Sequence, residues 1–94
     1  MTLPSGAVRV PEYVHWRRFD SELVLVDLKG GEYYGLNDVA ADAFERLARG
    51  QATSEVVVSL LELYEVKPAE LQKDVDDLVG VLIGLGLLVA DTAT

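Results

Sequence analysis

The sequence predicts a single α+β domain in which a three-stranded antiparallel sheet is followed by three helices. Two observations support this prediction. Residues 14–36 contain three short runs of β-prone and apolar side chains, separated by turn-forming residues. Residues 38–85 then show apolar side chains at helical spacing, interrupted by glycine and proline. No linker-like stretch separates the two halves, and a chain of 94 residues suits one hydrophobic core.

The first third of the chain has the pattern of a β-meander. The predicted strands are residues 14–19, 22–28 and 32–36. Asp20-Ser21 supplies the first turn, and Lys29-Gly30-Gly31 supplies a hairpin turn in which glycine accepts positive φ. The centre of the second strand, residues 23–26, is continuously apolar, which predicts that both of its faces are covered.

Three helices are expected in the remainder of the chain. Asn37 or Asp38 caps the first, and Gly50 ends it. Thr53 caps the second, and Pro68 opens the third, which continues to about residue 85. The first two helices each carry one apolar stripe that is expected in the core, namely Val39, Ala40, Ala43, Phe44 and Leu47, and then Val56, Val57, Leu60, Leu61 and Tyr64.

The ends of the chain are expected to lie outside the domain. Residues 1–12 contain two prolines and a glycine and are expected to form an extended, poorly ordered arm. Residues 13–90 form the predicted domain, and residues 91–94 a frayed tail. No signal peptide is visible, and the longest apolar stretch, residues 79–90, is too short to span a bilayer. A cytoplasmic protein without a membrane partner is therefore expected.

The composition argues against catalysis and against a metal or cofactor site. The chain has no cysteine and a single histidine, His15, and it has no nucleophile-elbow motif. Asp74, Asp76 and Asp77 fall within four helical positions and point in different directions, so they do not converge on a metal. These carboxylates form either a solvated helix face or a surface that attracts a basic partner. No enzymatic activity, cofactor or metal is expected.

The net charge of −8 disfavours binding to nucleic acid and to anionic lipid. This exclusion matters because the helical half has the layout of a winged-helix DNA-binding regulator. Such a regulator needs a basic recognition helix. The third predicted helix instead offers Lys73 among four acidic residues, and the second has no basic residue. We therefore expect no nucleic-acid partner.

The third predicted helix has more apolar surface than one covering layer buries. At about 100° per residue, a core stripe of the usual width is formed by Leu71, Val75, Leu78, Val79 and Leu82. Val81, Ile83 and Leu85 widen the apolar arc to roughly 200°. Either the returning segment 87–89 covers the excess, or part of it lines an open groove.

The third predicted strand, residues 32–36, ends the meander and is therefore a sheet edge, unless the first strand returns beside it. Natural edges are protected by lysine, proline or bulges, whereas this one has one charge, two tyrosines and no proline. Tyr33 and Tyr34 either pack as ordinary strand tyrosines, one inward and one half exposed, or contact a ligand; Leu36 is expected in the core. An unprotected edge beside an apolar helix predicts that an extended peptide binds as an additional strand.

Several motifs, taken together, resemble the PqqD-like family of leader-recognition elements for ribosomally made, modified peptides. In chain order they are Leu25-Val26-Asp27-Leu28-Lys29-Gly30-Gly31-Glu32-Tyr33-Tyr34-Gly35-Leu36-Asn37, Phe44 and Leu47 before Gly50, Tyr64-Glu65-Val66, and Asp74-Val75 through Gly86-Leu87. The similarity covers residues 14–89. Phe44 stands where many relatives carry tryptophan, and the N-terminal arm is not diagnostic.

The resemblance implies a winged-helix-like domain that binds the leader of a precursor peptide as an added strand. The implied cleft lies between the third strand and the third helix. Its implied contact residues are Glu32, Tyr33, Tyr34, Gly35 and Leu36 on the strand, Leu71, Asp74, Val75, Leu78 and Leu82 on the helix, and Val26 and Asp27 on the neighbouring strand.

A free-standing chain of this length most resembles the small leader-binding subunit of split lasso-peptide maturation proteases. The resemblance implies that a separate leader peptidase, or another maturation enzyme, is a partner. Leaders in that system often carry a Tyr-x-x-Pro motif, which suits apolar pockets with Asp74 or Asp77 at the rim for a basic residue. Similar chains also act as peptide chaperones in radical-enzyme cofactor pathways. A small dimerisation module that pairs through the groove is a further alternative, and a monomer or weak dimer is expected.

Overall fold

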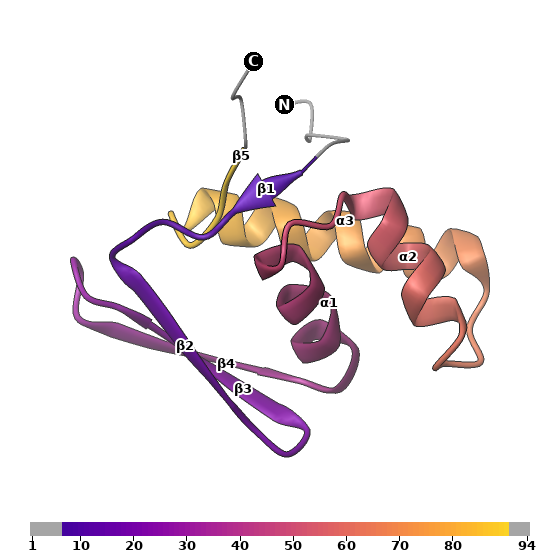
Figure 1. Ribbon diagram of the computed structural model, residues 1–94, viewed down its shortest axis with the longest axis horizontal. Helices are drawn as coiled ribbons and strands as arrows, with labels where there is room; N and C mark the ends of the chain where they lie inside the picture. The colour runs from indigo at the N-terminus through magenta and orange to yellow at the C-terminus, as the bar shows by residue number, and fades with distance from the viewer. Residues whose placement is uncertain (1–6, 91–94) are drawn as a thin grey trace.

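The computed structural model describes residues 7–90 and has an α+β architecture (Figure 1). A three-stranded antiparallel sheet comes first, formed in spatial order by β2 (Val14–Phe19), β3 (Glu22–Asp27) and β4 (Glu32–Asn37). Three helices follow, α1 (Asp38–Ala48), α2 (Thr53–Leu61) and α3 (Pro68–Gly84). The fold class and the order of elements predicted from the sequence are confirmed.

The central strand, β3, carries the part of the core that the sheet contributes. Antiparallel pairing places Leu25 between Trp16 of β2 and Tyr34 of β4. Leu23 and Leu25 are both fully buried, on the side of the sheet where α1 packs. Phe44 of α1 is also fully buried and meets Trp16 edge to face, with ring centroids 5.7 Å apart. This aromatic contact joins the sheet to the first helix.

The opposite face of the sheet is not covered by a helix, which corrects the prediction that both faces of β3 are buried. All three helices lie on one side of the sheet (Figure 1). Val24 and Val26 on the other side are only partly buried, and the neighbouring Phe19 and Tyr33 are 53% and 75% exposed. The continuous apolar run therefore reflects an apolar outer surface, and not a second covering layer.

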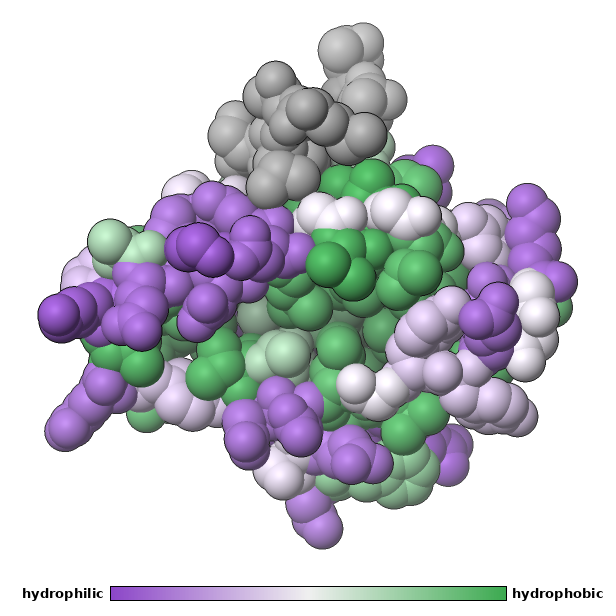
Figure 2. Space-filling model, turned by 180° about the vertical axis from the view of Figure 1, so that it is seen from behind, coloured by the Kyte–Doolittle hydropathy of each residue, from purple (hydrophilic) through white to green (hydrophobic). Residues whose placement is uncertain are grey.

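The segment after α3 covers only part of the apolar surface of this helix. Leu87 and Leu88 are fully buried, as expected if the returning chain packs on the helix. Val81 and Leu85 nevertheless remain 59% and 43% exposed. Figure 2, which views the molecule from behind the orientation of Figure 1, shows that hydrophobic residues stay uncovered on that face. The returning segment therefore covers part of the apolar arc, and Val81 and Leu85 stay exposed at the surface of α3.

Residues 7–12 belong to the folded domain, which differs from the expectation of a poorly ordered arm. In this segment β1 (Val8–Arg9) pairs antiparallel with β5 (Val89–Ala90). Val8 is only 2% exposed, and Pro11 is buried as well. A strand of two residues has no alternating pattern that sequence analysis can detect. The rest of the expected arm, residues 1–6, and the expected tail, residues 91–94, lie outside the described residues.

The N-terminus of α2 also differs from the prediction. Thr53 is the first residue of the helix, and Ala52 occupies the N-cap position that the sequence had suggested for Thr53. The Ala52 N–H donates to Glu55 Oε1 at 2.8 Å, so a glutamate in the first turn satisfies the backbone of the cap. Asn37 holds the N-cap position of α1, in agreement with one of the two predicted possibilities.

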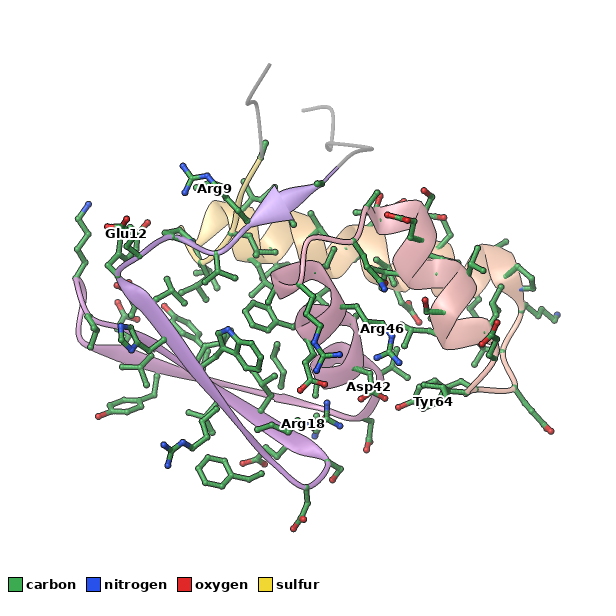
Figure 3. The ribbon with its side chains drawn as sticks, in the orientation of Figure 1. Arg9, Glu12, Arg18, Asp42, Arg46 and Tyr64 are labelled. Atoms are coloured by element: carbon green, nitrogen blue, oxygen red, sulfur yellow. The ribbon has the colours of Figure 1, made fainter. Side chains whose placement is uncertain are left out.

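A polar cluster ties β2 to α1 and to the segment after α2 (Figure 3). Arg18 Nη2 lies 2.8 Å from Asp42 Oδ1, and Arg18 Nη1 lies 3.3 Å from Glu45 Oε1. The Tyr64 hydroxyl donates to the Asp42 carboxylate. Burial alone would raise the pKa of Asp42, but the hydrogen bonds from Tyr64 and Arg18 outweigh it and lower this pKa.

The lowered pKa of Asp42 leads to a prediction about the free energy of unfolding and its dependence on pH. Asp42→Asn is expected to reduce the free energy of unfolding by about 1–2 kcal/mol near neutral pH, because charge-assisted hydrogen bonds are lost. The folded-state pKa of Asp42 lies below its ordinary value of 3.8, so this stabilisation is fully present above that value. It disappears as the pH falls through the folded-state pKa. Urea denaturation of both proteins from about pH 7 to about pH 2 measures the difference.

The matched control for this prediction is Asp77→Asn, which removes an exposed carboxylate that pairs with Lys73 at 2.9 Å. An exposed pair of this kind contributes less than about 0.5 kcal/mol, so the control is expected to stay close to the wild type. Equal losses in the two variants, or a difference that persists at the acid end of the range, would contradict the assignment.

Candidate peptide-binding groove

β4 is an open edge of the sheet. The strand order β2-β3-β4 leaves one side of β4 without a partner strand among residues 7–90, because β1 pairs with β5 instead. The Asp38 N–H donates to the Ser21 carbonyl at 3.0 Å, and such bonds recur at every second residue of an antiparallel ladder. The backbone amides of Tyr33, Gly35 and Asn37 therefore face outward. The predicted edge is confirmed.

The side chains of β4 alternate between the core and the outer face of the sheet. Tyr34 and Leu36 are partly buried and pack against the core. Tyr33 is 75% exposed, and a side chain added at Gly35 would meet no atom within 4 Å. The Tyr34 hydroxyl donates to Glu32 Oε2 at 3.0 Å, and this bond is the main cause of the raised pKa of Tyr34. One tyrosine thus packs inward and the other is exposed.

A hollow of about 210 Å³ lies between α1 and α3. It is lined by Val39, Ala40 and Ala43 from α1 and by Asp74, Val75 and Leu78 from α3. α1 follows β4 without a break, so the hollow begins where the open strand edge ends. Figure 2 shows hydrophobic residues gathered in a hollow at the centre of this face, with hydrophilic residues around it. An open strand edge and an apolar hollow therefore adjoin.

The predicted contact residues of α3 fall into two groups. Asp74 is exposed and Leu78 is half-buried at the hollow, and Val75 lines it although only 1% of this residue is exposed. Leu71 and Leu82 are each 2% exposed and belong to the hydrophobic core. The structure thus brings three of the five predicted helix residues to the hollow, and the other two support the helix from the core side.

Val26 and Asp27, which the resemblance implied as further contacts, do not lie at this hollow. Val26 pairs with Tyr33 and faces the outer surface of the sheet. Asp27 Oδ1 accepts hydrogen bonds from the backbone amides of Lys29 and Gly30, at 2.9 Å and 3.1 Å. Its carboxylate therefore stabilises the turn that leads into β4.

The residues of α1 that line the hollow were missed as site residues by the sequence reasoning. Val39, Ala40 and Ala43 were assigned to the core, because they form a stripe with Phe44 and Leu47. The available signal was side-chain size: two alanines lie on the first turns of the helix that follows the edge strand, and small residues leave space. Only Ala43 is fully buried among these three lining residues.

The acidic residues of α3 differ in what they contact. Lys73 Nζ lies 2.9 Å from Asp77 Oδ2, a contact that raises the pKa of Lys73. Asp76 Oδ1 accepts a hydrogen bond from Gln72 Nε2 at 3.0 Å. Asp74 forms no salt bridge with any residue between 7 and 90, and it lies at the hollow. Asp74 is therefore the carboxylate best placed to meet a basic side chain of a ligand.

A second depression, of about 340 Å³, lies on the uncovered outer face of the sheet. It is lined by His15, Trp16, Arg17, Phe19, Val24 and Val26. It lies beside β2, the other edge strand of the sheet, on the face that no helix covers. An added strand there would have no helix against which to place its side chains. The described residues contain no group of three or more potential ligands placed to hold a metal ion. Among these same residues, no helix has the length and apolar character needed to cross a membrane.

An open edge strand beside an apolar hollow is the arrangement of domains that take up a peptide as an added strand. The chain belongs to the PqqD family, since the family described as "Coenzyme PQQ synthesis protein D (PqqD)" matches residues 22–88. This match confirms the resemblance seen in the sequence. A comparison with curated protein sequences gave no match.

Two solved structures are similar to the chain over nearly its whole length. One, "TbiB1 in Complex with the TbiA(beta) Leader Peptide", is 26% identical, with a TM-score of 0.82; the alignment covers 92% of this chain and 98% of that one. The other, "Lasso peptide synthetase B1 complexed with the leader peptide", is 31% identical, with a TM-score of 0.81; here 89% of this chain and 99% of that one are covered.

Proposed function

We propose that this protein is a non-catalytic recognition element that binds the leader of a ribosomally made precursor peptide. The leader adds as a strand to the outer edge of β4 and places a side chain in the hollow between α1 and α3. The observation that carries this proposal is the unpartnered edge of β4 next to that hollow. Both similar structures were solved with a leader peptide bound, which supports the same use of this fold here.

The geometry suggests what kind of leader the groove accepts. Backbone hydrogen bonds to β4 supply affinity for any extended segment, and the hollow selects side chains. A dry apolar cavity of about 150 Å³ already binds benzene, so a hollow of about 210 Å³ admits one aromatic or large aliphatic side chain. Asp74 at the hollow favours a leader with a basic residue nearby.

We propose further that the precursor is that of a lasso peptide. Support comes from the similarity to a lasso peptide synthetase B1 that extends over 99% of that chain. The protein then presents the bound leader to a separate leader peptidase. The family description favours a second candidate, a peptide chaperone in the synthesis of a peptide-derived cofactor. The two candidates share the groove and differ in the precursor that is bound.

The outer face of the sheet is the surface that we propose for docking of the peptidase. This face stays accessible when a leader occupies the edge of β4, since it lies on the side of the sheet away from the helices. It combines the aromatic Phe19 and Tyr33 with Arg17, and aromatic residues and arginine are enriched among the residues that dominate binding energy in interfaces.

A second copy of the chain fits this outer face poorly. Two chains of net charge −8 repel each other, and face-to-face pairing would bring Arg17 of both copies together. Three strands of six residues span only about 300 Å² in projection, which suits a small, transient contact better than a stable dimer. A transient enzyme partner that presents carboxylates to Arg17 suits these properties better.

Calorimetric titration of the protein with the synthetic leader of a candidate precursor, sought among the neighbouring genes, tests the proposal. We expect a dissociation constant below about 10 µM, with a scrambled leader of the same composition as the control. A cofactor precursor titrated in the same way distinguishes the second candidate. The proposal is wrong if neither natural leader binds more tightly than its scrambled form.

A further inference from the structure

Tyr13 contacts the structural elements that lead to both walls of the groove. Its hydroxyl donates to the carbonyl of Gly86 at 2.8 Å, just after the end of α3. Its own carbonyl accepts a hydrogen bond from the Leu28 N–H at 2.9 Å, and Lys29 Nζ lies 4.8 Å from the centroid of its ring. Leu28 and Lys29 belong to the turn between β3 and β4. One half-buried residue thus joins the turn that precedes the edge strand to the segment that follows α3.

Tyr13 and the hollow lie at opposite ends of the groove. The turn before β4 and the end of α3 lie toward the same side of the molecule, and the start of α1 lies toward the other (Figure 1). The hollow involves Val39, next to the end of β4, and Asp74, in the first half of α3. α1 therefore separates β4 from α3 at one end of the groove, and Tyr13 connects the two walls at the other end.

The backbone at Gly86 explains why this connection affects α3. Gly86 has a φ of 77°, in the left-handed region that glycine adopts freely, and its N–H donates to the Ile83 carbonyl at 3.0 Å. The Leu87 N–H donates to the Leu82 carbonyl at 2.8 Å. The chain thus reverses direction directly after the helix, at the residue whose carbonyl Tyr13 holds.

We propose that Tyr13 is a positioning residue for peptide binding, which fixes the separation between the edge of β4 and α3. This inference rests on the proposed function. An added strand must lie about 4.8 Å from β4 while its side chains reach α3, so both walls have to be in place at once. A groove whose width is fixed before binding loses less conformational freedom and binds more tightly.

The substitution Tyr13→Phe tests this role, because it removes the hydroxyl and keeps the ring beside Lys29. Leader affinity is expected to fall roughly three- to tenfold, the effect of one hydrogen bond. The matched control is Tyr64→Phe, which also loses one hydroxyl bond, to Asp42, away from the groove. The control is expected to lower the melting temperature without changing leader affinity.

A distance measurement separates positioning from a merely structural role. The chain has no cysteine, so Tyr33→Cys on β4 and Leu85→Cys after α3 supply two exposed sites for spin labels. In the protein without leader, we expect Tyr13→Phe to broaden the distance distribution between the labels and Tyr64→Phe to leave it unchanged.

The possible results test the proposed function and the role of Tyr13 separately. If the wild type binds no leader, the proposed function fails, and the role of Tyr13 in binding fails with it. If the wild type binds and Tyr13→Phe shows the same affinity or the same distance distribution, the role of Tyr13 is overturned and the proposed function stands. An equal loss of affinity in Tyr64→Phe also overturns it, because the effect then follows stability.

Discussion

Replacing Leu78 with aspartate is expected to weaken leader binding at least about 100-fold while leaving the domain folded. Leu78 is half-buried at the hollow, next to Val39 and Val75. A bound leader would cover this position and remove the new carboxylate from water without a partner, which costs several kcal/mol. Asp74 lines the same hollow and would repel the new carboxylate, because the two side chains carry charges of the same sign.

Calorimetry with the cognate leader measures this effect, after circular dichroism has shown that the variant is folded. Val58→Asp is the matched control, because Val58 lies on α2 and is 63% exposed. The control is expected to bind the leader like the wild type. Wild-type affinity in Leu78→Asp would place the site elsewhere, and an equal loss in both variants would indicate a general effect of added negative charge.

The double substitution Arg17→Glu with Phe19→Ser is expected to slow leader removal by the peptidase about 30-fold. Both residues line the depression on the outer face of the sheet, and neither lines the hollow between α1 and α3. Leader affinity should therefore stay within about twofold of the wild type. The expected effect corresponds to the loss of one strong contact at an interface between two proteins.

The measurement is the rate of leader removal in a mixture of purified protein, precursor and peptidase, with calorimetry of leader binding in parallel. Arg49→Glu with Leu63→Ser makes the same charge reversal and also replaces an exposed apolar residue with serine, on the helical side of the molecule. With this control variant, the peptidase is expected to remove the leader at the wild-type rate. Equal rates in the two double variants would exclude the outer face as the docking surface.

Much of the fold follows from local sequence signals. The glycines after Lys29 require a turn, and the apolar spacing from Val39 to Leu47 requires a helix, so these elements were predicted within a few residues. The sequence did not reveal that the outer face of the sheet is uncovered. Periodicity shows which residues are apolar, but it does not show whether another layer exists to bury them. The pairing of β1 with β5 joins segments about 80 residues apart in the sequence, and no local sequence pattern indicates such a contact.

The candidate site was predictable to a similar degree. The open edge of β4 followed from strand order and from the lack of protecting residues, and the apolar width of α3 pointed to Leu78. The part played by α1 was not evident, since alanines on an apolar stripe look the same whether they fill a core or leave a hollow. The contacts of Tyr13 depend on the approach of Gly86, which lies 73 residues away in the chain.

The most direct test of the central claim is amide hydrogen exchange along β4, measured by NMR with and without the leader. If the leader adds as a strand, the amides of Tyr33, Gly35 and Asn37 should become protected on binding. Those of Tyr34 and Leu36 should change little, because the alternation of the ladder directs them toward β3. Binding of the leader with no gain of protection at Tyr33 and Gly35 would contradict strand addition at this edge.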